Sequence, residues 1–193
     1  MDGERLLAFI RELESRSRAL GIPSIEWEDG LVLHALSIVA GSRGEVTAAD
    51  LGAGIGYSTL WIAAGLEESC RGACRVYAVE EDPELASLGE RLASKAPLRR
   101  VKVEWVEGDA IEFLASLPDG SLDLAFVDID KHLYPEALRL LASKLSPGGA
   151  AVFHNAYLPA PPSEFYELAG REPWRGGITP TRLGLAVLVR AGS

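Results

Sequence analysis

Residues 50–58 read Asp50-Leu51-Gly52-Ala53-Gly54-Ile55-Gly56-Tyr57-Ser58, and this stretch decides the fold. An apolar segment ends in an acid, and three glycines at alternate positions then lead into a helical pattern. Glycine lets the backbone turn sharply, approach a ligand closely and pack a helix start against a strand, where a side chain would obstruct. The stretch therefore predicts a strand, a tight loop and a helix that together bind a nucleoside cofactor.

The spacing of the glycines indicates which cofactor. It is G-x-G-x-G, whereas a dinucleotide loop reads G-x-G-x-x-G and directs the helix N-terminus at a pyrophosphate. Asp50 stands at the end of the strand, and a carboxylate there favours a ligand with a cationic end. S-adenosylmethionine carries an ammonium and a sulfonium and no phosphate, so the loop predicts this cofactor. The alternative is a glycine-rich turn in an ordinary α/β domain.

Length and composition favour a single domain. A chain of 193 residues that is 48% hydrophobic can bury one substantial core, with residues 1–41 as a helical cap and 46–193 as the main body. No apolar run approaches the roughly 18 residues of a membrane span, and the N-terminus lacks a signal-peptide pattern, so we expect a cytoplasmic protein.

Charge argues against two classes of partner. The formal net charge of −9 disfavours broad electrostatic binding to nucleic acid or to an anionic membrane. A local basic patch could still form from the arginines near the C-terminus, although scattered solvated side chains are the simpler interpretation. These arginines are Arg171, Arg175, Arg182 and Arg190.

Thermolabile side chains are scarce. The chain has no Gln, one Asn and one Met, and it has fifteen Arg against four Lys, a composition that favours a thermophilic source. Cys70 and Cys74 are the only cysteines and cannot form a four-thiolate zinc site. Free thiols are the default expectation, and a local disulfide is the alternative because intracellular thermophile proteins can carry them.

Hydrophobic periodicity predicts alternating strands and helices after two N-terminal helices. We expect helices at 2–20, 28–41, 57–67, 83–96, 110–117 and 132–145, and strands at 46–51, 75–80, 101–106, 122–127, 149–154 and 185–189. The first five strands are nearly continuous apolar runs, which is typical of a parallel sheet with both faces covered. The fold class is therefore α/β: a Rossmann-like, doubly wound and mostly parallel sheet with an antiparallel C-terminal strand.

The helix expected at 2–20 is amphipathic. Leu6, Ile10 and Leu13 recur at helical spacing in a charged segment, so an apolar face must be covered by something. We expect a homodimer on this ground.

Polar residues follow the ends of the five parallel strands, the edge of such a sheet where ligands bind. Glu80 follows the last loop glycine at close to the roughly 20-residue distance at which an acid takes a ribose hydroxyl. Asp109 could instead only cap the next helix, and Glu80 could be a surface acid. The strand-end residues are Asp50, Glu80, Asp109, Ala110, Asp128, His154 and Asn155.

From about Glu26 to Arg190 the chain resembles the class I S-adenosylmethionine-dependent methyltransferases, and within them the metal-dependent caffeoyl-CoA and catechol O-methyltransferases. The loop is similar to the acid-x-Gly-x-x-x-Gly-Tyr-Ser motif of this family. The resemblance implies that Glu80 binds the ribose and that the pair Asp109-Ala110 contacts the adenine. It also implies that the methionine end is held by Asp50, Gly52, Gly54, Gly56 and Ser58, with Asp128 beside the cofactor.

The same resemblance implies a metal site and a base. Residues 122–131 are similar to the family's apolar strand followed by Asp-x-Asp-Lys, which would make Asp128 a metal ligand and Lys131 the general base. His154-Asn155 stands where the family has Asp-Asn as the remaining ligands. An imidazole suits Mn²⁺, Co²⁺, Fe²⁺ or Zn²⁺ better than Mg²⁺. Alternatively, His154 has no ligand role and Lys131 is a solvated lysine at a helix start.

The sequence leads to three functional hypotheses. The first is an O-methyltransferase that acts on a small hydroxylated acceptor, such as a catechol, with help from a divalent metal. The second is an RNA methyltransferase that modifies a tRNA base, against which the net negative charge counts. The third is a non-catalytic cofactor-binding protein.

Overall fold

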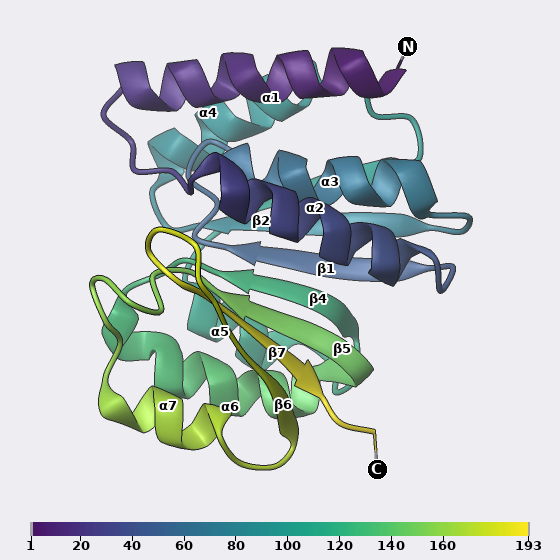
Figure 1. Ribbon diagram of the computed structural model, residues 1–193. Coiled ribbons are helices and arrows are strands. Elements are labelled where there is room, and N and C mark those ends of the chain that lie inside the picture. The colour runs from purple at the N-terminus through teal and green to yellow at the C-terminus, as the bar shows by residue number, and fades with distance from the viewer. Residues whose placement is uncertain (1, 193) are drawn as a thin grey trace.

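The computed structural model describes residues 2–192 and consists of one mixed β-sheet between two layers of helices (Figure 1). The helices are α1 (Asp2–Ala19), α2 (Trp27–Gly41), α3 (Tyr57–Ser69), α4 (Pro83–Ala93), α5 (Ala110–Ser116), the 3₁₀ turn η1 (Lys131–Leu133), α6 (Tyr134–Lys144) and α7 (Ser163–Ala169). The strands are β1 (Val46–Leu51), β2 (Cys74–Glu80), β3 (Val101–Glu107), β4 (Leu122–Val127), β5 (Leu145–Phe153), β6 (Trp174–Thr179) and β7 (Leu185–Arg190).

The order of the strands is β3-β2-β1-β4-β5-β7-β6. Strands β1 to β5 pair in parallel, and β7 pairs antiparallel with β5 and with β6. This confirms the predicted Rossmann-like class with an antiparallel C-terminal strand. The direction of winding reverses between β1 and β4, and the crevice beyond the carboxyl ends of strands at such a reversal is the usual ligand site.

Both faces of the central strands β1 and β4 are buried, which explains their apolar sequences. Alternate residues of a strand point to opposite faces. In β1, Ala48 joins the cluster under α1 to α4, while Ala49 and Leu51 join the cluster under α5 to α7. In β4, Phe126 and Val127 divide in the same way.

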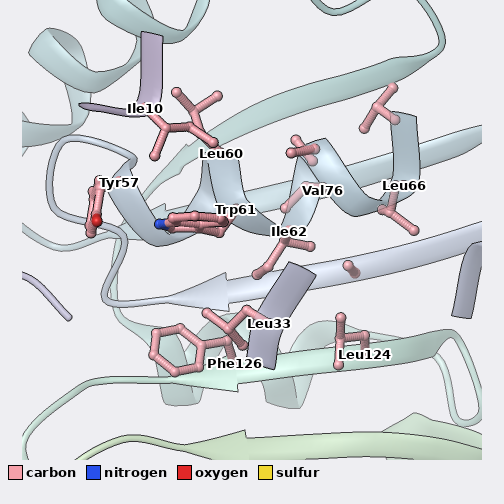
Figure 2. Close-up of a cluster of buried hydrophobic side chains, with 14 of the residues drawn as sticks. Ile10, Leu33, Tyr57, Leu60, Trp61, Ile62, Leu66, Val76, Leu124 and Phe126 are labelled. Carbon is pink, nitrogen blue, oxygen red and sulfur yellow. The ribbon is translucent and has the colours of Figure 1, made fainter. Parts of the chain in front are cut away.

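Trp61 of α3 lies at the centre of the first cluster (Figure 2). It is fully buried, with Leu33 of α2 and Ile10 of α1 in the same cluster. Two glycines allow α2 and α3 to lie this close. A Cβ at Gly30 would be 2.4 Å from the Trp61 ring, and one at Gly65 would be 2.3 Å from the carbonyl oxygen of His34.

The apolar face of α1 is covered within the chain. Leu6, Ile10 and Leu13 are each no more than 5% exposed and belong to the cluster that α3 also forms. The face from which we expected a homodimer is therefore occupied. A dimer stays a prediction, and Leu7 and Leu20 are the large apolar side chains of this segment that remain exposed.

The C-terminal third differs from expectation in one strand. The segment after β5 contains α7 and then β6, a strand that the hydrophobic periodicity does not predict. The sequence of β6 lacks a typical strand pattern, because it contains Arg175, Gly176 and Gly177 and glycine is depleted in strands. Gly176 is needed there, since a Cβ would lie 2.0 Å from the carbonyl oxygen of Val187 on β7. The helix predicted at 132–145 is also divided, into η1 and α6.

Cys70 and Cys74 form a disulfide, so the default expectation of free thiols is wrong. Their Cα atoms are 6.4 Å apart, and the bond joins the end of α3 to the start of β2. None of the helices within residues 2–192 is both long enough and apolar enough to cross a bilayer.

The close packing of α2 on α3 leads to a stability prediction. Gly65→Ala should lower the free energy of unfolding by about 1–3 kcal/mol, because the new methyl group would meet backbone that cannot move without shifting α2. Gly177→Ala is the matched control, since nothing lies within 4 Å of a Cβ there, and it should change stability by less than about 0.5 kcal/mol. Urea denaturation measures both, and equal effects would refute the packing argument.

Candidate functional site

A cavity of about 460 Å³ opens at the carboxyl ends of β1, β2, β3, β4 and β5. Its volume lies within the roughly 300–1,000 Å³ of small-molecule sites. Most of the predicted site residues line it: Gly52, Gly54, Glu80, Asp109, Ala110, Asp128, Lys131, His154 and Asn155. Of the other predicted residues, Ser58 lines a hollow of about 30 Å³ with Gly52, Gly54 and Asp128. Asp50 and Gly56 line neither.

The glycine loop crosses the end of β4 at very short range. Gly52 has a φ of 89°, and a Cβ at this position would lie 2.4 Å from the carbonyl oxygen of Asp128. Gly54 has a φ of 56°, which also lies in the left-handed region. Only glycine fits the first position, and the loop backbone is thereby held as a wall of the cavity.

Asp50 is fully buried below this loop. Its Oδ2 accepts hydrogen bonds from the hydroxyls of Ser58, at 2.7 Å, and Thr59. Its Oδ1 has no hydrogen-bond partner among residues 2–192. Burial raises the pKa of Asp50 to about 7, and the two hydroxyl hydrogen bonds limit that rise. The carboxylate therefore fixes the start of α3 and keeps one unsatisfied acceptor oxygen.

Glu80 fastens the loop from the neighbouring strand. Its Oε2 accepts the Gly54 N–H at 2.7 Å, and its Oε1 accepts the Asp82 N–H at 3.1 Å. The side chain is 8% exposed and borders the cavity, so it is not the free surface acid of the alternative interpretation. Asp109 caps α5, as in the alternative interpretation, since it accepts the Glu112 N–H at 2.8 Å, and it lines the cavity as well.

A chain of alternating charges runs along the other side of the cavity. Lys131 Nζ lies 2.8 Å from Asp128 Oδ1, and His154 Nδ1 lies 3.1 Å from Asp128 Oδ2. The other ring nitrogen, His154 Nε2, is 3.3 Å from Asp29 Oδ2, an ion-pair distance without the alignment of a hydrogen bond. Asp29 is completely buried in the first turn of α2, where its carboxylate also accepts the Glu26 N–H.

These contacts set the protonation states. Burial lowers the pKa of His154, but the two carboxylates outweigh it and raise the pKa to about 9. Burial raises the pKa values of Asp29 and Asp128, but His154, together with the Glu26 N–H at Asp29 and Lys131 at Asp128, outweighs burial, and both pKa values lie below their usual range. At neutral pH the site therefore holds an imidazolium between two carboxylates.

This arrangement does not fit the predicted metal site of Asp128, His154 and Asn155. Both His154 nitrogens face carboxylate oxygens, and both Asp128 oxygens face cationic side chains. The Asn155 side chain donates its Nδ2 to the carbonyl of Leu158 at 2.8 Å. Among residues 2–192, no group of three or more His, Cys, Asp and Glu side chains is placed to hold a metal ion. The ligand set expected from the sequence therefore stays a prediction, and the contacts of these three side chains do not support it.

Lys131 is held at the cavity wall by three acceptors. Its Nζ donates to Asp128, to the carbonyl of Ile129 at 3.2 Å and to the hydroxyl of Tyr134 at 2.9 Å. The buried Tyr134 hydroxyl in turn lies 3.0 Å from the Val127 carbonyl and 2.9 Å from the His154 carbonyl. Lys131 is thus not a solvated lysine, because its side chain is 19% exposed and fully engaged.

Several residues of this site were not predicted. Asp29 carried only the signal of an acid in the first turn of a helix, and Tyr134 looked like an ordinary core aromatic. Part of the unpredicted wall comes from the link between α1 and α2 and from the β6–β7 loop: Ile22, Pro23, Ser24 and Leu183. Nothing in their residue types distinguishes them, because their place depends on how distant segments meet.

Comparison with known proteins identifies relatives. A family model described as a methyltransferase domain matches residues 49–156, more than half of the chain. A candidate O-methyltransferase from Mycolicibacterium smegmatis is 31% identical over 155 residues, which cover 78% of this chain and 69% of that protein. One from Mycolicibacterium vanbaalenii is also 31% identical over 155 residues, and there the chain spans 64% of the relative's length, just under two thirds.

The fold also matches solved structures. An O-methyltransferase from Bacillus cereus in complex with SAH superposes with a TM-score of 0.75 at 22% identity. The match covers 95% of this chain and 90% of that one. At this level of identity the likeness concerns the fold.

The histidine between two carboxylates predicts a pH-dependent stability. A pKa raised from 6.5 to about 9 contributes stability that is fully present below pH 6.5 and is lost as pH rises through 9. The free energy of unfolding should fall by up to about 3 kcal/mol over this window. Urea denaturation at a series of pH values measures it. The fall should vanish in His154→Gln and persist in His132→Gln, which alters an exposed histidine. The same fall in His154→Gln would contradict the assignment.

Proposed function

This chain belongs to the family of S-adenosylmethionine-dependent, O-methyltransferase-like enzymes, and from that membership we propose that it transfers a methyl group to a hydroxyl of a small acceptor. One observation carries the proposal. A single cavity is lined both by the glycine loop with Glu80 and Asp109 and by the pair Asp128 and Lys131. Residues suited to a nucleoside cofactor and residues suited to proton transfer therefore meet in one space.

The residues of the cavity fit S-adenosylmethionine. The loop at Gly52 and Gly54 leaves a backbone wall without side chains, and Glu80 and Asp109 bring carboxylates rather than the basic groups that a phosphate would need. We propose that Glu80 binds the ribose hydroxyls and that Asp109 and Ala110 contact the adenine. The methionine end would lie by the loop. There Asp50, with its unpartnered oxygen, orients Ser58.

The bound cofactor would supply an electrophilic methyl carbon next to its sulfonium. The chain must then hold an acceptor oxygen in line with that carbon, exclude water and remove the proton of the hydroxyl. We propose that Lys131 rests as an ammonium fixed by Asp128 at the cavity wall, loses one proton to solvent when the acceptor binds, and then accepts the hydroxyl proton as general base. The chain of contacts from Asp128 through His154 to Asp29 keeps the Asp128 carboxylate in place.

The lining favours a small, weakly polar acceptor over RNA. Leu133 and Leu183 contribute apolar side chains to the lining of the cavity. The acidic side chains of the lining outnumber the one lysine, and they would repel the sugar-phosphate backbone of RNA. These acids are Glu80, Glu81, Asp109, Asp128 and Asp130.

The methyltransferase assignment predicts turnover that depends on Lys131. With labelled S-adenosylmethionine, the parent should methylate at least one member of a panel of catechols and other phenols, and not bulk tRNA. Lys131→Ala should lower kcat by about 10²–10⁴, the usual share of a general base, while cofactor affinity changes little. Lys131→Arg should not restore the rate, because a guanidinium stays protonated.

Lys102→Ala is the matched control, since that lysine is exposed on β3, and it should turn over at the parental rate. A rate in Lys131→Ala within a few-fold of the parent would remove Lys131 from the reaction. Recovery in Lys131→Arg would show that a positive charge, rather than a base, is required. Methylation of tRNA alone would overturn the choice of acceptor class.

The ribose assignment predicts a loss of cofactor affinity. Glu80→Ala should weaken binding of S-adenosylmethionine by about 1.5–3 kcal/mol, the typical value of a hydrogen bond to a charged group. Glu81→Ala is the control, because this neighbouring acid borders the same cavity but is exposed. Isothermal titration calorimetry measures both, and thermal unfolding checks the Gly54 loop that Glu80 fastens. Unchanged affinity in a folded Glu80→Ala protein would exclude the ribose role.

A further inference from the structure

Two carboxylates and two basic side chains form one cluster beside the cavity: Asp29, His154, Asp128 and Lys131. In this cluster the basic side chains supply the positive charge that a metal ion would supply in a metal site. We propose that this site uses no divalent metal, and that the His154 side chain lies where such an ion would bridge the carboxylates of Asp29 and Asp128. The metal-binding measurements described below do not depend on the proposed function, whereas the methyl-transfer measurement does. The proposal departs from the metal-dependent chemistry that the sequence resemblance implies.

The first argument is the geometry of the imidazole. Its two nitrogens face oxygens of two different carboxylates, Asp128 at 3.1 Å and Asp29 at 3.3 Å. A lone pair directed at a carboxylate oxygen would be repelled, so both nitrogens must carry hydrogen. A metal ligand needs a free lone pair on one of them. His154 therefore bridges the two acids and has no atom left for a metal.

The second argument is the balance of charge. Asp29 and Asp128 are matched by His154 and Lys131, and the contacts between them are no longer than 3.3 Å. A divalent ion added here would bring two further positive charges to a place where 4% of the His154 side chain and none of the Asp29 side chain is exposed. Unpaired charge in such a place is strongly unfavourable, because it is removed from water without a counter-charge.

The third argument is what the bridge connects. Asp29 belongs to the first turn of α2, and Asp128 follows β4, so the two acids come from distant parts of the chain. Two carboxylates brought this close need a cation between them. The buried ring of His154, at the end of β5, supplies one and so fixes α2 against the catalytic edge of the sheet. We therefore regard His154 as a positioning residue for Asp128.

Direct metal binding tests the proposal without an acceptor. The parent, His154→Asp and the control His132→Asp are stripped with a chelator and titrated with Mn²⁺, followed by calorimetry and by the electron paramagnetic resonance signal of free Mn²⁺. The parent and His132→Asp should show no stoichiometric binding. His154→Asp exchanges the imidazole for a carboxylate, an oxygen ligand that Mn²⁺ and Mg²⁺ accept, and should bind Mn²⁺ at least tenfold more tightly than the parent.

The outcomes separate the two proposals. One equivalent of Mn²⁺ bound by the parent would overturn the metal-free site, and so would a chelator-induced loss of methyl transfer that Mn²⁺, Co²⁺, Zn²⁺ or Mg²⁺ restores. A folded His154→Asp protein that binds no better than the parent would show that His154 does not stand in the place of an ion. If that variant does not fold, the titration of the parent decides. Absence of methyl transfer to every acceptor would refute the proposed function and leave the binding result intact.

Discussion

The close crossing of the glycine loop over the end of β4 is the contact on which the rest of the site depends. The Asp128 N–H donates to the Leu51 carbonyl at 2.9 Å, and Gly52 then passes directly over the Asp128 carbonyl. This contact lies where the winding of the sheet reverses, so it joins the half that carries Glu80 and Asp109 to the half that carries Lys131 and His154. A side chain at position 52 would push these halves apart, and the cavity would lose its common floor.

Much of this architecture could be predicted from the sequence, because the relevant signals are local. Continuous apolar runs predict buried parallel strands, and the carboxyl ends of such strands share one edge. The residues at those ends could therefore be named from spacing alone, and Glu80, Asp109 and Asp128 do line one cavity. Strand β6 was not predicted, because it contains Gly176 and Gly177 and glycine has a low strand propensity. Gly176 is nevertheless suited to this edge strand, since the backbone of β7 approaches it closely.

The chemical identity of the site could not be predicted in the same way. From the sequence, His154 and Asn155 were expected to be metal ligands, because Asp128 was the only residue expected to lie beside them. Asp29 precedes His154 by 125 positions in the sequence. Only the packing of α2 brings its carboxylate to the Nε2 side of the imidazole, opposite Asp128. A second carboxylate favours the protonated form of the His154 imidazole, which cannot bind a metal. One long-range contact therefore changes the role expected for the His154-Asn155 pair. Such contacts leave no trace in spacing or periodicity.

The walls of the cavity also divide along the chain. The region shared with the methyltransferase-domain family, residues 49–156, contains the glycine loop, Glu80, Asp109, Asp128 and Lys131. Ile22 and Leu183 lie outside it, on segments joined to each other through α2, whose Glu28 accepts the Arg182 N–H at 3.1 Å. Substitutions in these outer segments can reshape one wall of the cavity while the inner residues stay the same. The fold thus separates a core shared with the methyltransferase-domain family from a rim built by other segments, so the proposed cofactor side and the proposed acceptor side rest on different parts of the chain.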